Sequence, residues 1–331
     1  MLHATTDANE WNALKGDIDD VYWSWEHLAR WASVEGGRPV GLVWTSPSNR
    51  CALPLIQIPL DALPGGEGLS DVRSAYDFGG PRFGTAPSPE EILAFRADYT
   101  SWLTEERVVT EFMRLHPVVH QVTHPFAEQH GQHHIIDLSD GLEAARAGYS
   151  RSFRRNLRKG LRSGLRGFFV ADPTPEQAER FIALYNGTME RVGASVLYQF
   201  ADAALNGLLR APETHLVLVE WEGEIVAASI ALRSGPGLMY HLTGSAARSP
   251  NAGELIIDTT AELAARLGCD WVHLGGGAPS LSEFKARAAN AQVPYFIVKR
   301  VVQPDAYQRL CAALGLDSAQ GGFPAYYPLP G

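Results

Sequence analysis

The sequence predicts a mixed α/β protein with two domains. Its 331 residues are enough for about two domains of ordinary size. In the first half, β-rich runs alternate with segments of helical spacing. In the second half, two β-rich runs at 215–221 and 224–232 flank Glu222-Gly223, which is typical of a hairpin turn. We therefore expect mixed sheets with helices in both halves.

The composition is that of an ordinary folded protein, with 45% hydrophobic and 20% charged residues. No apolar stretch reaches the ~18 residues of a spanning helix. The first residues lack the basic and apolar regions of a secretion signal. The three cysteines, Cys51, Cys269 and Cys311, show no CxxC spacing, which argues against a disulfide framework or a zinc site. These features predict a cytoplasmic protein without a membrane span.

The first half is expected to contain a helix, a strand pair, a glycine-rich loop, a second helix and two further strands. In chain order these are 12–34 (helix), 38–44 and 51–58 (strands), 76–84 (loop), 89–104 (helix) and 108–115 and 133–138 (strands). Ser88 is the expected N-cap of the second helix.

A basic segment follows, predicted as one helix over 142–163 or two helices broken near Gly148. The net charge of −9 excludes the whole chain as a typical nucleic-acid binder. Locally, however, no acidic residue interrupts a run of cations, and acidic partners one turn away would stabilise a merely solvated face. A solvated helix face is the alternative, but the run favours a phosphate-bearing ligand. The cations are Arg146, Arg151, Arg154, Arg155, Arg158, Lys159, Arg162 and Arg166.

The second half is predicted to run helix, helix, strand, strand, strand, helix, strand, short helix, strand, after a strand at 167–171. The helices are 175–192, capped by Thr174, then 201–209 and 253–267, which ends at Gly268. The strands are the hairpin pair, 237–244, 271–274 and 295–302.

The most informative segment lies between the last two of these strands. There Gly275, Gly276 and Gly277 end a β-rich run, and a short helix start delivers Lys285. Glycines at a strand end allow a backbone or a ligand to approach closely. A lysine beside such a gap suits a phosphate or a developing negative charge. The alternative is a tight turn with a solvated lysine.

Motifs spread along the chain carry a resemblance to a known family. They are Asp20-Val-Tyr22, Leu53-Pro-Leu55, Tyr76 to Pro81, Phe112 to Pro117, Phe153 to Lys159, Tyr185 to Arg191, Tyr198-Gln-Phe200, Tyr240 to Gly244, and Leu274 to Gly277 with Phe284-Lys285. In this order they resemble the Gcn5-related acyltransferase fold, and more narrowly the FemAB family of aminoacyl-tRNA-dependent peptidyltransferases. The resemblance implies two tandem acyltransferase-like domains, at 1–145 and 146–310, followed by a tail at 311–331.

The chain also departs from related patterns. The family often has another aromatic shortly after the Phe-Lys pair, whereas here Ala-Arg-Ala-Ala-Asn follows, so the mouth of the acceptor channel is expected to differ. Enzymes of this fold that use acetyl-CoA hold pyrophosphate on the amides of a glycine loop at a helix start. At 247–255 Pro250 removes one amide and Glu254 would repel phosphate. These residues favour a donor other than acetyl-CoA.

The resemblance implies attack by an acceptor amine on the ester of aminoacyl-tRNA, with that tRNA as co-substrate and no cofactor or metal. The acceptor is expected to be a small peptide or a nucleotide-linked sugar-peptide. Lys285 would face the acceptor end of the tRNA, with Phe284 as its packing or base-stacking neighbour. Arg191 and Thr188 would contact acceptor phosphates, and Tyr198 and Tyr240 would position the acceptor or relay its proton. Arg154, Arg155, Arg158 and Lys159 would face the tRNA or a diphosphate.

Each of these residues also has a structural alternative: core packing for Phe284 and the two tyrosines, and an ion pair with Glu190 for Arg191. No general base stands out among Asp137, Asp258, His241 and His273. No His cluster has metal spacing, because neighbouring His133 and His134 would point to opposite faces of a strand. Two other functions stay open: an N-acyltransferase that uses acyl-CoA or a carrier-protein thioester, and a non-catalytic binding protein. The sequence leaves the oligomeric state open.

Overall fold

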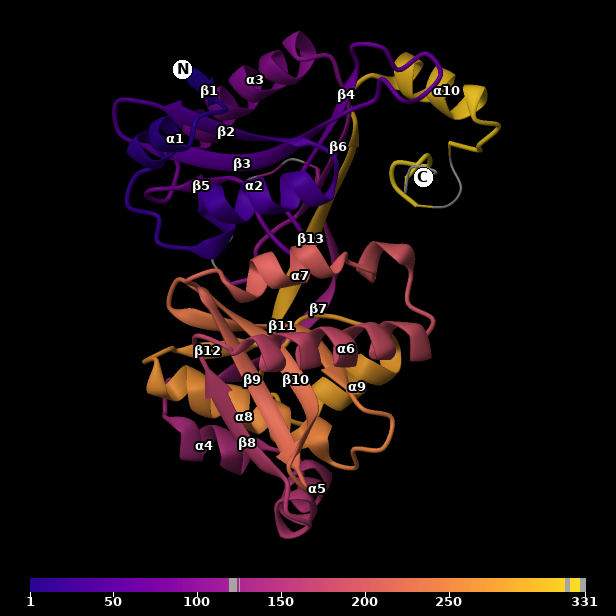
Figure 1. The fold of residues 1–331 in the computed structure, drawn as a ribbon. Helices are drawn as coiled ribbons and strands as arrows, with labels where there is room; N and C mark the ends of the chain where they lie inside the picture. Colours follow the sequence, from indigo (N-terminus) through magenta and orange to yellow (C-terminus); the bar gives the residue numbers. More distant parts are fainter. Residues whose placement is uncertain (119–123, 125, 319–321, 328–331) are drawn as a thin grey trace. The chain divides into compact units, whose positions relative to one another are not determined.

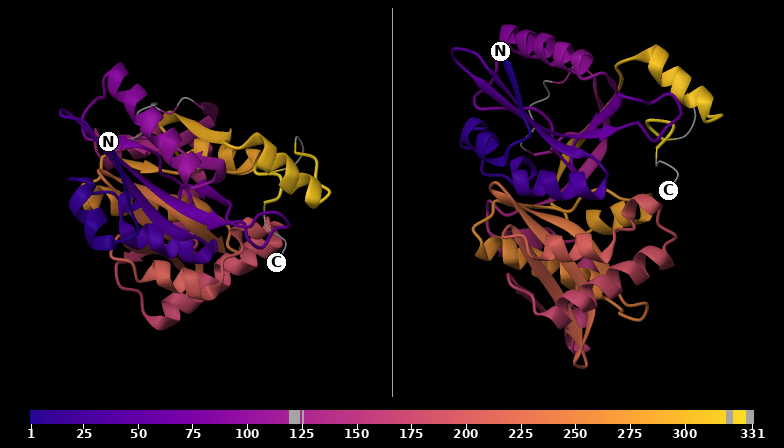
Figure 2. Two further views of the ribbon diagram at one scale, coloured as in Figure 1. Left: turned by 90° about the horizontal axis from the view of Figure 1, so that it is seen from above. Right: turned by 45° about the horizontal axis from the view of Figure 1, so that its top comes forward.

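The computed structural model describes residues 1–118, 124, 126–318 and 322–327. The chain forms two compact units, residues 1–131 with 294–331 and residues 132–293. Each unit contains a sheet covered by helices (Figure 1, Figure 2). The mixed α/β class predicted from the sequence is therefore confirmed.

The units have different limits from the predicted domains. Residues 294–310, expected in the second domain, lie in the first unit because strand β13 (Ala291–Val301) pairs with strand β6 (Val108–Arg114). Residues 132–145, expected in the first domain, lie in the second unit, where the end of β7 (Ala127–Asp137) pairs with β12 (Trp271–His273). Both pairings join strands far apart in the sequence, so neither leaves a local signal.

The sheet of the first unit has the order β1-β2-β3-β4-β6-β13, with β5 paired to β3. Its neighbours are antiparallel except β4 and β6. The remaining strands are β1 (Leu2–Thr5), β2 (Arg38–Thr45), β3 (Arg50–Pro59), β4 (Ser70–Arg73) and β5 (Arg82–Phe83). The helices are α1 (Ala8–Leu14), η1 (Val21–Trp23), α2 (Trp25–Val34), α3 (Pro89–Glu105) and α10 (Pro304–Ala313).

Strand β3 is the centre of this unit and is buried along nearly all of its length. Cys51, Leu53 and Leu55 pack in one core cluster with Phe95 and Tyr99 of α3. Helix α2 packs on β2 and β3 from the other face (Figure 1). Burial on both faces explains why this run is continuously apolar.

The single helix predicted over 12–34 is wrong, because the chain breaks it into α1, η1 and α2. Gly16 follows α1 with a φ of 78°, a left-handed conformation that ends the helix. Asp20 and Ser24 then accept backbone N–H groups as caps of η1 and α2. Ser88 caps α3 through a complete capping box, as predicted.

The sheet of the second unit has the order β7-β12-β11-β10-β9-β8. Its neighbours are antiparallel except β11 and β12. The remaining strands are β8 (Arg166–Val170), β9 (Thr214–Trp221), β10 (Glu224–Ser234) and β11 (Gly237–Ser245). The helices are α4 (Leu142–Gly148), α5 (Arg151–Arg162), α6 (Pro175–Arg191), η2 (Val196–Tyr198), α7 (Asp202–Leu209), α8 (Ala252–Arg266) and α9 (Pro279–Ala286).

Local sequence signals in this unit are confirmed. Glu222 and Gly223 form the hairpin turn between β9 and β10 with φ values of 53° and 83°. Thr174 caps α6 through a capping box with Gln177. Of the two alternatives for 142–163, the structure has two helices, because the side chain of Ser150 caps the start of α5. Apart from η2, which was not predicted, the order of the remaining elements is the predicted one.

Across the described residues, no helix combines the length and apolar character needed to cross a membrane.

Candidate functional site

Strands β11 and β12 separate in the middle of the second sheet. Their parallel pairing ends at Met239 and His273, although β11 continues to Ser245. On its other edge, β11 has one extra residue between Tyr240 and Thr243 relative to its partner β10, which marks a bulge. After β12 the chain turns away at the three glycines. Tyr240 therefore lies where the two strands part.

Lys285 of α9 is buried beside this point, with only 6% of its surface exposed. Its Nζ donates to the carbonyl oxygen of Gly276 at 2.5 Å and lies 5.8 Å from the centre of the Tyr240 ring. A carbonyl dipole and an aromatic face both stabilise an ammonium group that has lost water. Lys285 is thus buried in the second unit and is not a solvated surface lysine.

All three glycines are required by this arrangement. Gly275 has a φ of 73°, and a Cβ built there would lie 3.5 Å from Lys285 Nζ. A Cβ at Gly276 would lie 2.9 Å from Nε2 of His133, closer than real contacts allow. The side chain of Lys285 therefore lies directly beside Gly275, and that of His133 lies directly beside Gly276. Gly277 follows with a φ of 141°, and a Cβ there would lie 2.7 Å from Cδ2 of Leu281.

Tyr240 is held in its protonated form. Burial raises the pKa of its phenol to about 12, although a hydrogen bond with Thr243 partly offsets this. At neutral pH the side chain can therefore donate a proton or a hydrogen bond, but it is not a base.

Two histidines contact the glycine turn, and a third lies on the opposite face of β7. Gly275 N–H donates to His273 Nδ1 at 3.2 Å, and His273 Nε2 lies 3.0 Å from His133 Nδ1. His134 points to the other face of β7, as predicted, where its Nε2 lies 3.0 Å from Ser282 Oγ of α9. The contact between His273 and His133 was not predicted from the sequence. The only sequence signal for this contact is the alternation of side-chain direction along β7. That alternation predicts the contact only once β7 is known to pair with β12.

Phe284 is half-buried and packs against the core of this unit. Its ring lies 6.3 Å from that of Phe153, and it covers the first turn of α8, where a Cβ on Gly253 would lie 3.1 Å from it. The guanidinium of Arg287 lies 4.9 Å from the ring centre. Phe284 therefore links α9 to the starts of α5 and α8.

The start of α8 contains a carboxylate. Glu254 is 7% exposed, and its Oε1 accepts a hydrogen bond from Asn156 Nδ2 at 2.9 Å and lies 3.9 Å from Arg287. A helix N-terminus favours anions, and here a side chain of the protein already supplies one. The same turn also has Phe284 packed against it, so it is a poor place for a pyrophosphate.

Arg191 and Thr188 lie at the end of α6, beside the end of β11. Arg191 Nη2 donates to the carbonyl oxygen of Ser245 at 3.0 Å and to Thr188 Oγ1 at 3.2 Å. Thr188 Oγ1 in turn accepts from the backbone N–H of Ser245 at 2.9 Å. Among the ion pairs of the described residues, none joins Arg191 to Glu190. The exposed guanidinium is thus fixed to the strand that also contains Tyr240.

Tyr198 lies in η2 with 42% of its surface exposed, so it is not a core residue. Its carbonyl oxygen accepts from the hydroxyl of Tyr185 at 2.7 Å, which fixes its backbone to α6. Tyr198 follows Arg191 closely in the sequence. Among the described residues, no hydrogen bond joins it to Lys285 or Tyr240.

The basic residues of α5 face away from the core. Phe153 and Gly160 are buried on the inner side, and α5 packs on α8. Within the described part of the chain, four of its cations make no ion pair, and of these only Arg154 makes a described side-chain hydrogen bond, to the carbonyl oxygen of Ala147. These four are Arg154, Arg155, Arg158 and Lys159.

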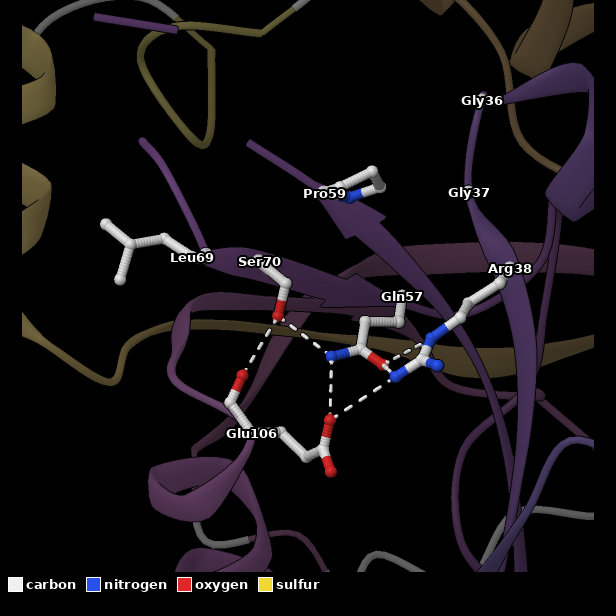
Figure 3. Close-up of a pocket in the computed structure, with 9 residues that line it drawn as sticks. Gly36, Gly37, Arg38, Gln57, Pro59, Leu69, Ser70 and Glu106 are labelled. Atoms are coloured by element: carbon white, nitrogen blue, oxygen red, sulfur yellow. Dashed lines mark hydrogen bonds and ion pairs between the residues drawn. The ribbon is translucent and has the colours of Figure 1, made fainter. Parts of the chain in front are cut away.

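The first unit contains a separate pocket of about 450 Å³ (Figure 3). Its polar side chains bind one another: Gln57 Nε2 donates to Ser70 Oγ at 3.0 Å, Arg38 Nη2 donates to Gln57 Oε1 at 2.8 Å, and Glu106 accepts from both Gln57 and Arg38. It contains none of the predicted site residues. In the described residues we find no group of three or more His, Cys, Asp or Glu side chains placed to hold a metal ion.

Comparisons with known proteins support the fold. Residues 147–286 match the family model described as acetyltransferase (GNAT) domain. The crystal structure of FemX is similar over 93% of this chain and 99% of that chain, with 12% identity and a TM-score of 0.68. The fold is that of FemX. The fold expected from the resemblance is thus confirmed, with a GNAT domain matched at 147–286.

Two further structures share this fold. L-PGS from Bacillus licheniformis is 12% identical, with a TM-score of 0.57 over 93% of this chain and 96% of that chain. The C-terminal domain of a putative lysylphosphatidylglycerol synthetase from Agrobacterium fabrum is 13% identical, with a TM-score of 0.55 over 93% and 97%. No curated protein matches the sequence.

Proposed function

We propose that this chain is an aminoacyltransferase that moves an amino acid from aminoacyl-tRNA to the amine of a peptide or nucleotide-linked sugar-peptide. The observation that carries the proposal is the buried ammonium group of Lys285, held where β11 and β12 separate. The GNAT match and the names of the structures with this fold support acyl transfer, and aminoacyl transfer in general.

The reaction needs orientation, charge stabilisation and a proton path. The acceptor nitrogen attacks the ester carbonyl, and the bond to the 3′-oxygen of the tRNA breaks. Lys285 offsets the negative charge that develops on the carbonyl oxygen or on the leaving oxygen. The protonated phenol of Tyr240 gives its proton to the 3′-oxygen and takes up the amine proton in the same step, so that the tyrosine is unchanged and the net transfer is from the amine to the leaving oxygen.

The donor is proposed to be an RNA rather than a coenzyme A ester. The exposed cations of α5 suit RNA phosphates, and α5 adjoins Phe284, the neighbour of Lys285 in α9. Glu254 and Phe284 at the start of α8 disfavour a pyrophosphate there. Because charged tRNA is a cytoplasmic substrate, we place the reaction in the cytoplasm.

The acceptor is proposed to bind along the end of β11. Arg191 is exposed and fixed to Ser245, so its remaining donors suit a phosphate of a nucleotide-linked acceptor. Tyr198, exposed on the segment that follows α6, is the proposed contact for the peptide part.

The test is transfer of a labelled amino acid from charged tRNA to a short peptide or a nucleotide-linked sugar-peptide. We expect a labelled amide product that disappears when the tRNA is first digested with ribonuclease. A product that survives this digestion would contradict the proposal. The chain with Lys285→Met is the matched control and should yield little product.

A second candidate, an N-acyltransferase that uses acyl-CoA or a carrier-protein thioester, is favoured by the GNAT match. Coenzyme A that raises the unfolding temperature, together with transfer from a thioester, would support it. A non-catalytic binding protein, the third candidate, predicts that Lys285→Met leaves function in cells unchanged.

A further inference from the structure

We propose that His133 and His273 form a neutral, hydrogen-bonded pair that positions the Gly275–Gly276 turn and, through the Gly276 carbonyl, Lys285. These histidines are positioning residues and have no direct part in the chemistry. The effect on activity rests on the proposed function, whereas the state of the pair does not.

The glycine turn is held from two sides. On one side, His273 Nδ1 accepts the N–H of Gly275, and His133 Nε2 packs against Gly276 so closely that a Cβ would lie 2.9 Å from it. On the other side, the Gly276 carbonyl accepts Lys285 Nζ. A shift of the turn on the histidine side therefore moves the acceptor that fixes the ammonium group.

The hydrogen bonds determine where the protons lie. Because His273 Nδ1 accepts from Gly275, this ring is neutral and has its proton on Nε2. That proton is donated to His133 Nδ1, which must then have a free lone pair. His133 is therefore also neutral, with its proton on Nε2, towards Gly276. The two hydrogen bonds, from Gly275 to His273 and from His273 to His133, form together only when both rings are uncharged.

Uptake of one proton by either ring breaks one of these two hydrogen bonds. Protonation of His273 at Nδ1 removes the acceptor for Gly275, and protonation of His133 at Nδ1 removes the acceptor for His273. Acidification is thus expected to make the turn more mobile and, with it, the Gly276 carbonyl that holds the Lys285 ammonium group. Within residues 132–293, the charged or titratable side chains on the neighbouring elements are Lys285 and the exposed Glu283 of α9, His134 and Asp137 of β7, and Tyr240 and His241 of β11.

The direct test is nitrogen NMR of the full chain labelled in its histidine rings. Spectra of His133→Asn and His273→Asn assign the two rings. We expect at pH 7.5 that His273 is protonated only on Nε2 and accepts on Nδ1, and that His133 is protonated only on Nε2. A cationic ring at this pH, or the opposite tautomer of either ring, would overturn the proposal whether or not the chain transfers amino acids.

The second test uses transfer activity. In His133→Asn the amide oxygen takes the place of Nδ1 as acceptor but does not titrate there, whereas His133→Leu has no acceptor. We expect kcat to fall about tenfold in His133→Leu with KM for the acceptor within twofold, because orientation is lost and binding is kept.

The Asn variant separates positioning from bulk. It is expected to retain most of the wild-type kcat at pH 7.5 and to lose less activity than the wild type on acidification to pH 6. An unchanged kcat and pH profile in His133→Leu would overturn the positioning role. If the wild type itself transfers nothing, the proposed function fails, and the NMR result alone decides the state of the pair.

Discussion

Lys285 and Gly276 are joined by a hydrogen bond of 2.5 Å from the buried ammonium group to the backbone carbonyl nine residues earlier. This bond closes the loop between β12 and α9 and holds the cation next to Tyr240. It connects the glycine turn, where each of the three glycines has a structural reason, to the group that we propose acts in transfer.

Replacement of this cation should affect catalysis more than folding. We expect Lys285→Met to lower the transfer rate by about 10²- to 10³-fold, the range for loss of one group that stabilises developing charge. Met fills a similar volume without a buried charge, so the unfolding temperature should change little. The exposed Lys299 is the control, and Lys299→Met should match the wild type in both measurements. Equal loss in both variants would refute a specific role.

The close approach at Gly276 predicts a stability cost. We expect Gly276→Ala to lower the free energy of unfolding by about 1–3 kcal/mol, because the new Cβ forces the His133 ring to move. Gly187 is the matched control, since it lies within α6 and a Cβ there meets no atom within 4 Å. Gly187→Ala should be neutral or stabilise by about 0.5–1 kcal/mol through helix propensity. Denaturant titration of both variants checks the pair, and a neutral Gly276→Ala would contradict the close contact.

The exposed cations of α5 predict salt-dependent RNA binding. Arg155→Gln, Arg158→Gln and Lys159→Gln together should weaken tRNA binding and reduce the slope of log K against log salt by about 2–3. Measurement by filter binding between low and moderate salt gives both quantities. The control removes three exposed cations outside α5 and combines Arg210→Gln, Lys299→Gln and Arg309→Gln. In this variant the slope should stay within about 1 of the wild-type value. The same loss in both triple variants would indicate only a net-charge effect.

In the first unit, the buried Asp71 predicts that stability falls as the pH rises, which is opposite to the acid sensitivity expected for the histidine pair. It is 7% exposed, and burial raises the pKa of its carboxyl to about 6, although Thr110 N–H and the hydroxyl of Tyr326 bind it. The unfolded pKa is about 3.9, so the folded state binds the extra proton between about pH 4 and 6. The contribution of Asp71 to stability is therefore complete at low pH and is lost as pH rises through 6.

Comparison with Asp71→Asn isolates this effect. Between pH 4 and 7 the wild type should lose about 2–3 kcal/mol of unfolding free energy relative to the variant. The measurement is chemical denaturation at several pH values. A constant difference between the two proteins over this range would show that the carboxyl pKa is not raised.

Local elements of this fold could be predicted because neighbouring residues determine them. Ser88 and Thr174 each cap the helix that begins next to them, and Glu222-Gly223 makes its turn without help from distant residues. The single helix predicted over 12–34 is wrong for an equally local reason. Gly16 adopts a left-handed conformation within a segment whose spacing otherwise favours a helix.

The site could be predicted only in part. The glycines and Lys285 are close in sequence, and their motif was sufficient to mark them. The burial of Lys285, however, depends on the separation of β11 from β12, and the link between His133 and His273 depends on the pairing of β7 with β12. Such pairings between distant strands leave no spacing in the sequence, and neither does the return of β13 to the first unit.

The central claim is tested most directly by comparing two donors with the same acceptor. In one reaction the wild-type chain is incubated with an amine acceptor and charged tRNA that carries a labelled amino acid. In a parallel reaction the corresponding coenzyme A thioester replaces the charged tRNA. The account predicts a labelled amide from the tRNA, abolished by ribonuclease and by Lys285→Met, and no product from the thioester. Product from the thioester alone, or from the tRNA mixture after complete digestion of the RNA, would contradict it.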